Sequence, residues 1–177
     1  SLVCAGLFVR GLQRSQAVDI GVRAPEQVLL ASTSLFLAGH TSDTTGGPVL
    51  ERLLAEVRTL PGVRSASVAT RVALGFGGGN SSSFDVEGYE FRPDENSAIP
   101  WSSVGADYFA TMGTAILRGR EFATADRSGT QPVAVVNEAF ARRYWPGREA
   151  LGRQISFSGG EWRTVVGISR DAKLEKL

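Results

Sequence analysis

Side chains able to do chemistry are few in this chain of 177 residues, and they lie far apart. There is one histidine, His40, and one cysteine, Cys4. A serine–histidine–aspartate triad would have to use His40, which lies in a polar stretch over residues 39–47. A histidine-rich metal site and an internal disulfide bond are both excluded. Acid–base or metal chemistry would therefore depend on carboxylates.

The best candidate pair of carboxylates is Asp85 and Glu87, in the stretch FDVEGY at residues 84–89. Apolar and acidic residues alternate there, which predicts a half-exposed strand with both acids on one face. Such a pair can act in acid–base catalysis or bind calcium. Two acids on an exposed strand face are usually only solvated, however, so we expect no catalytic site and no metal site.

Two further patterns could bind phosphate. The glycine- and serine-rich stretch over residues 74–83 lacks the Gly-Lys-Ser/Thr that a phosphate-binding loop requires, so we interpret it as a flexible connection. Arg118 and Arg120 share one side of an extended segment at residues 116–122. Arginines at this spacing can bind phosphate, but more often they face solvent or cap neighbouring groups.

The overall composition predicts one domain, or two small subdomains with a common core. With 19 basic and 18 acidic residues the formal charge is +1, which is too balanced for a general nucleic-acid binder. Residues 1–12 (SLVCAGLFVRGL) are apolar but shorter than the roughly 20 residues that span a bilayer. They fit either the end of a transmembrane helix or an ordinary amphipathic helix.

Residues 132–147 (PVAVVNEAFARRYWPG) carry the clearest structural signals. The β-branched run at 133–136 predicts a buried strand, and Asn137 is a good N-cap for a helix that Pro146 and Gly147 terminate. Glu138 places negative charge at the positive end of that helix. This strand–cap–helix unit is architectural, because it contains no nucleophile, base or metal ligand.

The remaining patterns predict a mixed set of helices and strands. A helix over residues 48–60, with Pro48 in its first turn and one apolar face, lies between strands at 27–37 and 63–72; together they predict a βαβ unit with a right-handed crossover. Residues 106–112 predict a short helix ended by Gly113. Strands are also expected at 99–104, 151–157 and 161–169, of which the last two form a hairpin.

Five ordered motifs together resemble one family. They lie in residues 105–122 (GADYFATMGTAILRGREF), 126–157 (DRSGTQPVAVVNEAFARRYWPGREALGRQISF) and 162–173 (WRTVVGISRDAK). These segments resemble the periplasmic core domain of MacB-like and FtsX-like ABC transporter permeases. Residues 60–78 and 84–89 are similar to the form found in duplicated permeases that lack an ATPase domain of their own.

The resemblance implies an α+β fold with two lobes, a porter-like βαβ lobe and a mostly-β lobe inserted into it. It assigns residues 1–16 to the end of the first transmembrane helix and a linker, and 17–74 to the first part of the porter-like lobe. Residues 75–160 would be the inserted lobe with short helices, and 161–177 a return strand toward the porter-like lobe, truncated. The porter-like lobe would then be incomplete, with an exposed sheet edge or apolar face that favours pairing between chains as a dimer.

The resemblance also implies a function. The domain would be a non-catalytic, extracytoplasmic part of an ABC-type permease in the bacterial inner membrane, periplasmic and joined to the membrane through flanking helices. It would carry no cofactor, because ATP would be hydrolysed on a separate cytoplasmic ABC ATPase. Coupling to that ATPase would let the domain handle an exported substrate or a periplasmic protein.

The alternative is a periplasmic binding module for a peptide, a lipid or a partner protein. Its cleft would have a lip of glycines and exposed aromatic side chains, since aromatic residues often anchor interfaces. For Trp101 a core position is the competing interpretation. The predicted lip residues are Phe76, Gly77, Gly78, Tyr89 and Trp101.

Overall fold

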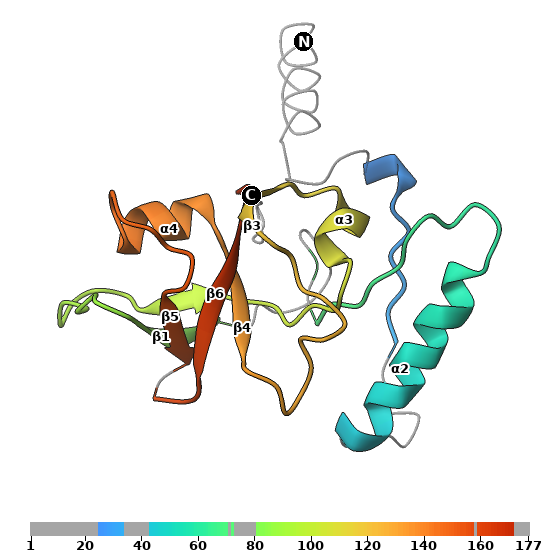
Figure 1. Cartoon of the computed structure of the whole chain (residues 1–177), viewed down its shortest axis with the longest axis horizontal. Coiled ribbons are helices and arrows are strands. Elements are labelled where there is room, and N and C mark those ends of the chain that lie inside the picture. Colours follow the sequence, from blue (N-terminus) through green and yellow to red (C-terminus); the bar gives the residue numbers. More distant parts are fainter. Residues whose placement is uncertain (1–24, 34–42, 71, 73–80, 158, 172–177) are drawn as a thin grey trace, which may run out of the picture.

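The structure is a computed structural model, and it describes residues 25–33, 43–70, 72, 81–157 and 159–171. The chain forms an α+β fold in which one sheet is accompanied by short helices (Figure 1). In chain order its elements are η1 (Pro25–Gln27), α2 (Asp43–Arg58), β1 (Ser81–Val86), β2 (Ala98–Pro100), α3 (Tyr108–Met112), β3 (Ile116–Gly119), β4 (Val133–Asn137), α4 (Glu138–Tyr144), β5 (Gln154–Phe157) and β6 (Trp162–Ser169).

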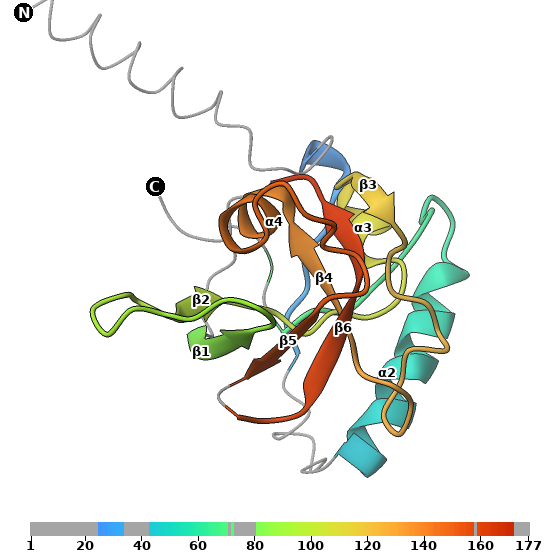
Figure 2. The same cartoon turned by 60° about the vertical axis from the view of Figure 1, so that its left-hand side comes forward.

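Strand β6 is the centre of the six-stranded sheet. Thr164 is paired with both Val133 and Gln154, and farther along Gly167 is paired with both Val135 and Gly119. Strand β4 therefore takes one side of β6, in parallel, while β5 and β3 share the other side, antiparallel. Beyond β5 the sheet continues through β1 to β2 (Figure 2).

The expected division into residues 75–160 and 161–177 stays a prediction. Within the sheet, β6 is hydrogen-bonded to three strands that lie within 75–160. Val165 is 1% exposed and Ile168 5%, so β6 supplies the middle of the core. The expected β5–β6 hairpin is confirmed.

The unit expected over residues 132–147 is confirmed in detail. Strand β4 runs directly into α4, and the Asn137 side-chain oxygen accepts the Phe140 backbone N–H at 2.9 Å, as an N-cap does. Tyr144 and Trp145 at the end of α4 are 4% and 3% exposed. They join the buried side chains of β1, β4, β5 and β6 in one hydrophobic core.

Two glycines mark a close approach between β3 and β6. Gly119 has φ +72°, and a Cβ placed on it would lie 2.2 Å from the Val166 carbonyl oxygen. A Cβ on Gly167 would lie 2.1 Å from the Arg120 carbonyl oxygen. The Arg120 N–H donates to the Val166 carbonyl at 2.9 Å, so backbone meets backbone here with no room for side chains.

The predicted βαβ unit over residues 27–72 is not seen in the described residues. Residues 63–70 are extended but form only a short pairing with 103–105, through the bridge between Ala69 and Val104. Described residues 28–33 form no strand, and 34–37 lie outside the described part. A strand pattern specifies an extended backbone, whereas a ladder also requires a partner in the right place.

Helix α2 begins earlier than predicted, at Asp43, so Pro48 lies inside it rather than in its first turn. Proline lacks the N–H that would bond to the carbonyl four residues before it. The predicted apolar face is present but largely uncovered: Val49, Leu53 and Leu60 are 38%, 44% and 54% exposed. In both views α2 lies at the edge of the molecule, apart from the sheet (Figures 1 and 2).

The shorter elements are present, but two of the strands have different bounds from those predicted. Helix α3 ends at Gly113, whose φ of +68° is the left-handed conformation expected of a helix terminator. The strand expected at 99–104 shrinks to β2, and the one at 84–89 begins earlier as β1. Among the helices of the described residues, none is long and apolar enough to cross a membrane.

Candidate functional site

Of the predicted lip, Tyr89 and Trp101 belong to the described residues. Phe76, Gly77 and Gly78 lie outside them. Trp101 is half-buried against Phe157, with ring centroids 4.8 Å apart, and its Nε1–H donates to the Ser82 hydroxyl at 3.1 Å. Trp101 thus packs against the core.

Tyr89 is also half-buried, and it lies at the other end of β1. Its N–H donates to the Val86 carbonyl, whereas Trp101 contacts Ser82. Four strand residues, at roughly 3.3 Å each, separate these contacts by about 13 Å. Tyr89 packs edge-on against Tyr144, with centroids 4.9 Å apart. The two aromatic residues therefore pack near opposite ends of β1.

The candidate carboxylates Asp85 and Glu87 are both occupied in structural roles. The Asp85 carboxylate accepts the Gly159 N–H at 2.8 Å, at the turn between β5 and β6. The Glu87 carboxylate accepts the Gln154 N–H at 2.9 Å and pairs with Arg153 at 3.1 Å. Each acid fixes a different turn or strand end. No cluster of three or more histidine, cysteine or acidic residues that could hold a metal occurs in the described residues.

Ion pairs join the motifs to one another. Most of these pairs connect segments that are remote in sequence, so they tie strands, helix and turns into one frame. We call this set the braced frame; its pairs are Arg118–Glu149, Arg120–Asp126, Arg142–Asp171, Arg143–Glu95 and Arg153–Glu87. The arginines of the motifs thus bind carboxylates of the same chain, which corrects any interpretation of Arg118 and Arg120 as free phosphate ligands.

One of these pairs lies in an aromatic cluster. The Glu95 side chain is 9% exposed; it accepts hydrogen bonds from the Tyr89 hydroxyl at 2.8 Å and from Arg143 at 2.8 Å. Arg143 also lies over the Tyr144 ring, 5.1 Å from its centroid. The bond from Arg143, with that from Tyr89, holds the pKa of Glu95 below its usual range, and the bond to Glu95 raises the pKa of Tyr89.

This arrangement predicts acid sensitivity. A carboxyl group whose pKa is lower in the folded state stabilises the fold fully above its unfolded pKa of about 4.3, and this contribution is lost as the pH falls through the folded pKa. When the pH is lowered from about 7 to about 3, we expect the urea concentration at the unfolding midpoint to fall less for the Glu95→Gln variant than for the parent chain. A residual fall is expected in both, because Arg120 lowers the pKa of Asp126 in the same way. Equal falls in the two chains would contradict the prediction.

A second pair clamps the end of β6 to α4. Asp171 follows β6, and its carboxylate accepts the Ala139 backbone N–H at 2.8 Å and pairs with Arg142 at 3.1 Å. A carboxylate at a helix start satisfies a free N–H group and suits the helix dipole. The segment that leaves the sheet is therefore held to the helix on top of it.

Removing this clamp should loosen α4. We expect Asp171→Ala to lower the free energy of unfolding by about 1 kcal/mol, the usual cost of losing a helix cap, and to speed amide exchange in α4. Urea unfolding and hydrogen exchange measure the two effects. The control is Glu138→Ala, which removes a 3.9 Å exposed pair with Arg142 and a charge at the start of the helix but no capping bond, and should cost about 0.5 kcal/mol. Equal losses in the two variants would contradict the clamp.

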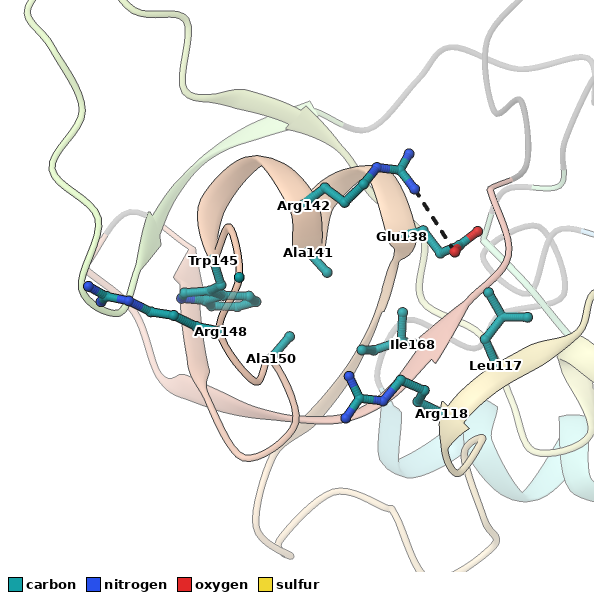
Figure 3. Close-up of a pocket in the computed structure, with 10 residues that line it drawn as sticks. Leu117, Arg118, Glu138, Ala141, Arg142, Trp145, Arg148, Ala150 and Ile168 are labelled. Carbon is teal, nitrogen blue, oxygen red and sulfur yellow. Dashed lines mark ion pairs between the residues drawn. The ribbon is translucent and has the colours of Figure 1, made fainter.

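A hollow beside α4 could receive a ligand group. It is an open groove of about 240 Å³ between α4, the turn after it, and strands β3 and β6 (Figure 3). Its floor is apolar, and its rim carries three arginines and one glutamate. We call it the α4 groove; it is lined by Leu117, Arg118, Glu138, Ala141, Arg142, Trp145, Gly147, Arg148, Ala150 and Ile168.

The α4 groove has almost no signature in the sequence. The i,i+4 spacing of Ala141 and Trp145 on one helix face was its only local signal. Leu117 and Ile168 reach the same hollow from two strands, and only the pairing of β3 with β6 brings them together. That pairing is long-range, so no short motif could reveal it.

Fold and site together define a small α+β domain held by a braced frame, with a shallow groove and, in its described residues, no metal cluster. A family model described as the MacB-like periplasmic core domain matches residues 1–176, and the chain belongs to this family. No curated protein is found to match the chain.

Several solved structures are similar, among them the following three. The periplasmic region of MacB from Actinobacillus actinomycetemcomitans has a TM-score of 0.53 and 18% identity, over 68% of this chain and 50% of that one. The extracellular domain of the noncanonic ABC-type transporter YknZ from Gram-positive bacteria has a TM-score of 0.48 and 19% identity, over 68% and 57%. A domain of a putative permease protein from Porphyromonas gingivalis has a TM-score of 0.46 and 16% identity, over 67% of this chain and 44% of that one.

The MacB likeness shows that the fold is shared, which agrees with the expected α+β class. The chain spans less than two thirds of the length of each of these three structures.

Proposed function

We propose that this chain is the extracytoplasmic domain of an ABC-type permease in a bacterial inner membrane, periplasmic and non-catalytic. In this proposal ATP is hydrolysed on a separate cytoplasmic subunit, and the permease transmits the resulting movement to this domain. The domain then acts on an exported substrate or a periplasmic protein. The family match over residues 1–176 is the observation that carries the proposal.

The braced frame supports a role in transmission. A domain that relays movement has to shift as one body, and ion pairs between remote segments oppose internal deformation. The clamp at Asp171 adds to this, because a pull on the chain beyond β6 would reach α4 as well as the sheet. Relay of this kind requires the permease to have two conformational states. Nucleotide binding at a distant site then changes the populations of these states.

The experiment that tests the proposal is purification of the full-length permease after crosslinking on its periplasmic side, followed by mass spectrometry. Co-purification of a cytoplasmic ABC ATPase is the expected result. ATP-dependent change in the crosslinks of this domain would support coupling. A permease that purifies without any ATPase would overturn the proposal.

A second candidate function is that of a periplasmic binding module for a peptide, a lipid or a partner protein. The α4 groove favours it, because an apolar floor beneath a charged rim is the usual anatomy of a recognition site. The two functions are compatible, since a domain that relays movement must also hold what it moves. The predicted lip, formed by Phe76, Gly77, Gly78, Tyr89 and Trp101, belongs to this candidate and stays a prediction.

A further inference from the structure

The α4 groove has a size that suits one side chain rather than a whole small molecule. Its volume of about 240 Å³ lies below the roughly 300–1,000 Å³ of typical small-molecule pockets. Ala141 and Ala150 leave the hollow open because they are small, while Trp145 and Ile168 form apolar walls (Figure 3). A short, open, apolar hollow of this kind is typical of the anchor pockets in protein interfaces.

The charges on the rim define the chemistry of the partner. Arg118 is paired with Glu149, and Arg142 is paired with Asp171 and lies near Glu138. The Arg148 side chain, beside Trp145, has no ion pair or hydrogen bond with any other described residue. The three arginines and their acidic neighbours Glu138, Glu149 and Asp171 balance in number, so the unpaired charge is local: of the three arginines, Arg148 alone lacks a partner among the described residues, and a carboxylate could pair with it.

An exposed apolar side chain extends the surface beyond the hollow. Leu117 is 45% exposed and lines the groove from β3, opposite the α4 side (Figure 3). A contact that buries Leu117 would remove its apolar surface from water, which favours binding. Tryptophan, leucine and arginine side chains thus surround one hollow, a composition in which tryptophan and arginine are frequent hot-spot residues.

We propose that the α4 groove is a docking surface for a periplasmic protein segment that presents one bulky apolar side chain next to a carboxylate. The apolar side chain enters the hollow over Ala141 and Ala150, and the carboxylate pairs with Arg148. The inference rests on the proposed function as an extracytoplasmic domain, and it names the chemistry of the partner.

The test uses peptides as probes. A library of short random peptides is selected against the full chain, and the enriched peptides are expected to carry leucine, isoleucine or phenylalanine within two residues of aspartate or glutamate. Ala141→Phe, which fills the hollow, should weaken the binding of a selected peptide at least about tenfold. Ala139→Phe is the matched control, because Ala139 is exposed on the same helix and does not line the groove.

A second variant protects the test against misfolding. Arg148 is exposed, so Arg148→Glu should leave the fold intact, weaken the selected acidic peptides and, in a fresh selection, enrich lysine or arginine in place of the acid. Selection that yields no apolar–acidic peptide, or peptides that bind the Ala141→Phe and Ala139→Phe chains equally, would overturn the proposal. Binding to phosphatidylglycerol vesicles that only Ala141→Phe abolishes would overturn it in favour of a lipid.

The groove and the proposed function can fail separately. In the full-length permease, Ala141→Phe should leave co-purification of the cytoplasmic ATPase unchanged while it abolishes binding of the selected peptide. Loss of both would mean that the groove serves assembly of the permease, and this would also overturn the docking proposal.

Discussion

Replacing Gly119 with alanine should lower the free energy of unfolding by about 3 kcal/mol or more, a large part of the stability of a domain of this size. Two costs add. The φ of +72° is strained for any residue with a Cβ, at about 1–2 kcal/mol, and the new Cβ would lie 2.2 Å from the Val166 carbonyl oxygen. Backbone cannot rotate away as a side chain can, so β3 would have to separate from β6. Urea unfolding followed by circular dichroism measures the loss.

The matched control is Gly152→Ala. Gly152 has a φ of +82°, but a Cβ there would meet nothing within 4 Å. This variant carries the backbone strain without the clash, so it should cost only about 1–2 kcal/mol. Gly167→Ala carries the clash without the backbone strain, because its Cβ would lie 2.1 Å from the Arg120 carbonyl oxygen while Gly167 has no positive φ. If Gly119→Ala and Gly152→Ala lost the same stability, the close approach of β3 and β6 would be wrong.

The glycine pair explains part of what the motifs encode. Arg-Gly-Arg at residues 118–120 and Val-Val-Gly at 165–167 look unrelated in sequence, yet their glycines face each other across a strand pair. The arginines on either side of Gly119 bind Glu149 and Asp126. The resemblance therefore rests largely on residues that hold one another in place, which is why the motifs predict a family without predicting a catalytic site.

Local signals predicted the parts of the fold that depend on neighbouring residues. The β4–Asn137–α4 unit, the stop at Gly113 and the β5–β6 hairpin all follow from caps, breakers and alternation within a few residues. The predicted strand at 63–72 is not formed in the described residues, because a strand also depends on a remote partner. Its alternating pattern is present, but residues 103–105 offer only a short pairing, and no local pattern specifies where a partner will lie.

The same distinction between local and long-range contacts applies to the candidate functional residues. Asp85 and Glu87 were recognised as acids, but their partners Gly159 and Gln154 lie some seventy positions away, so their structural roles could not be read from the sequence. The α4 groove likewise exists only after β3 and β6 pair. Where a function depends on surfaces built from remote segments, a sequence predicts the family more readily than the site.

Trp145 should be the most costly side chain to remove from the core. It is 3% exposed, its ring lies 5.7 Å from that of Phe140, and its Nε1–H donates to the Glu87 carbonyl at 2.9 Å. Truncating a buried tryptophan to alanine costs about 3–5 kcal/mol, because transfer energy is lost and a cavity remains. We expect that loss for Trp145→Ala in urea unfolding followed by circular dichroism, which does not depend on the tryptophan signal.

Trp145→Phe and Trp162→Ala separate the contributions to that loss. Phenylalanine keeps most of the apolar volume but leaves the Glu87 carbonyl without its donor, so about 1–3 kcal/mol should be lost. Trp162 is 45% exposed, and its truncation should change stability by less than about 1 kcal/mol. Because Trp145 also walls the α4 groove, Trp145→Phe should weaken groove peptides in chains that are still fully folded, whereas Trp162→Ala should not. A Trp162→Ala loss as large as that of Trp145→Ala would mean that the core is centred elsewhere in the sheet.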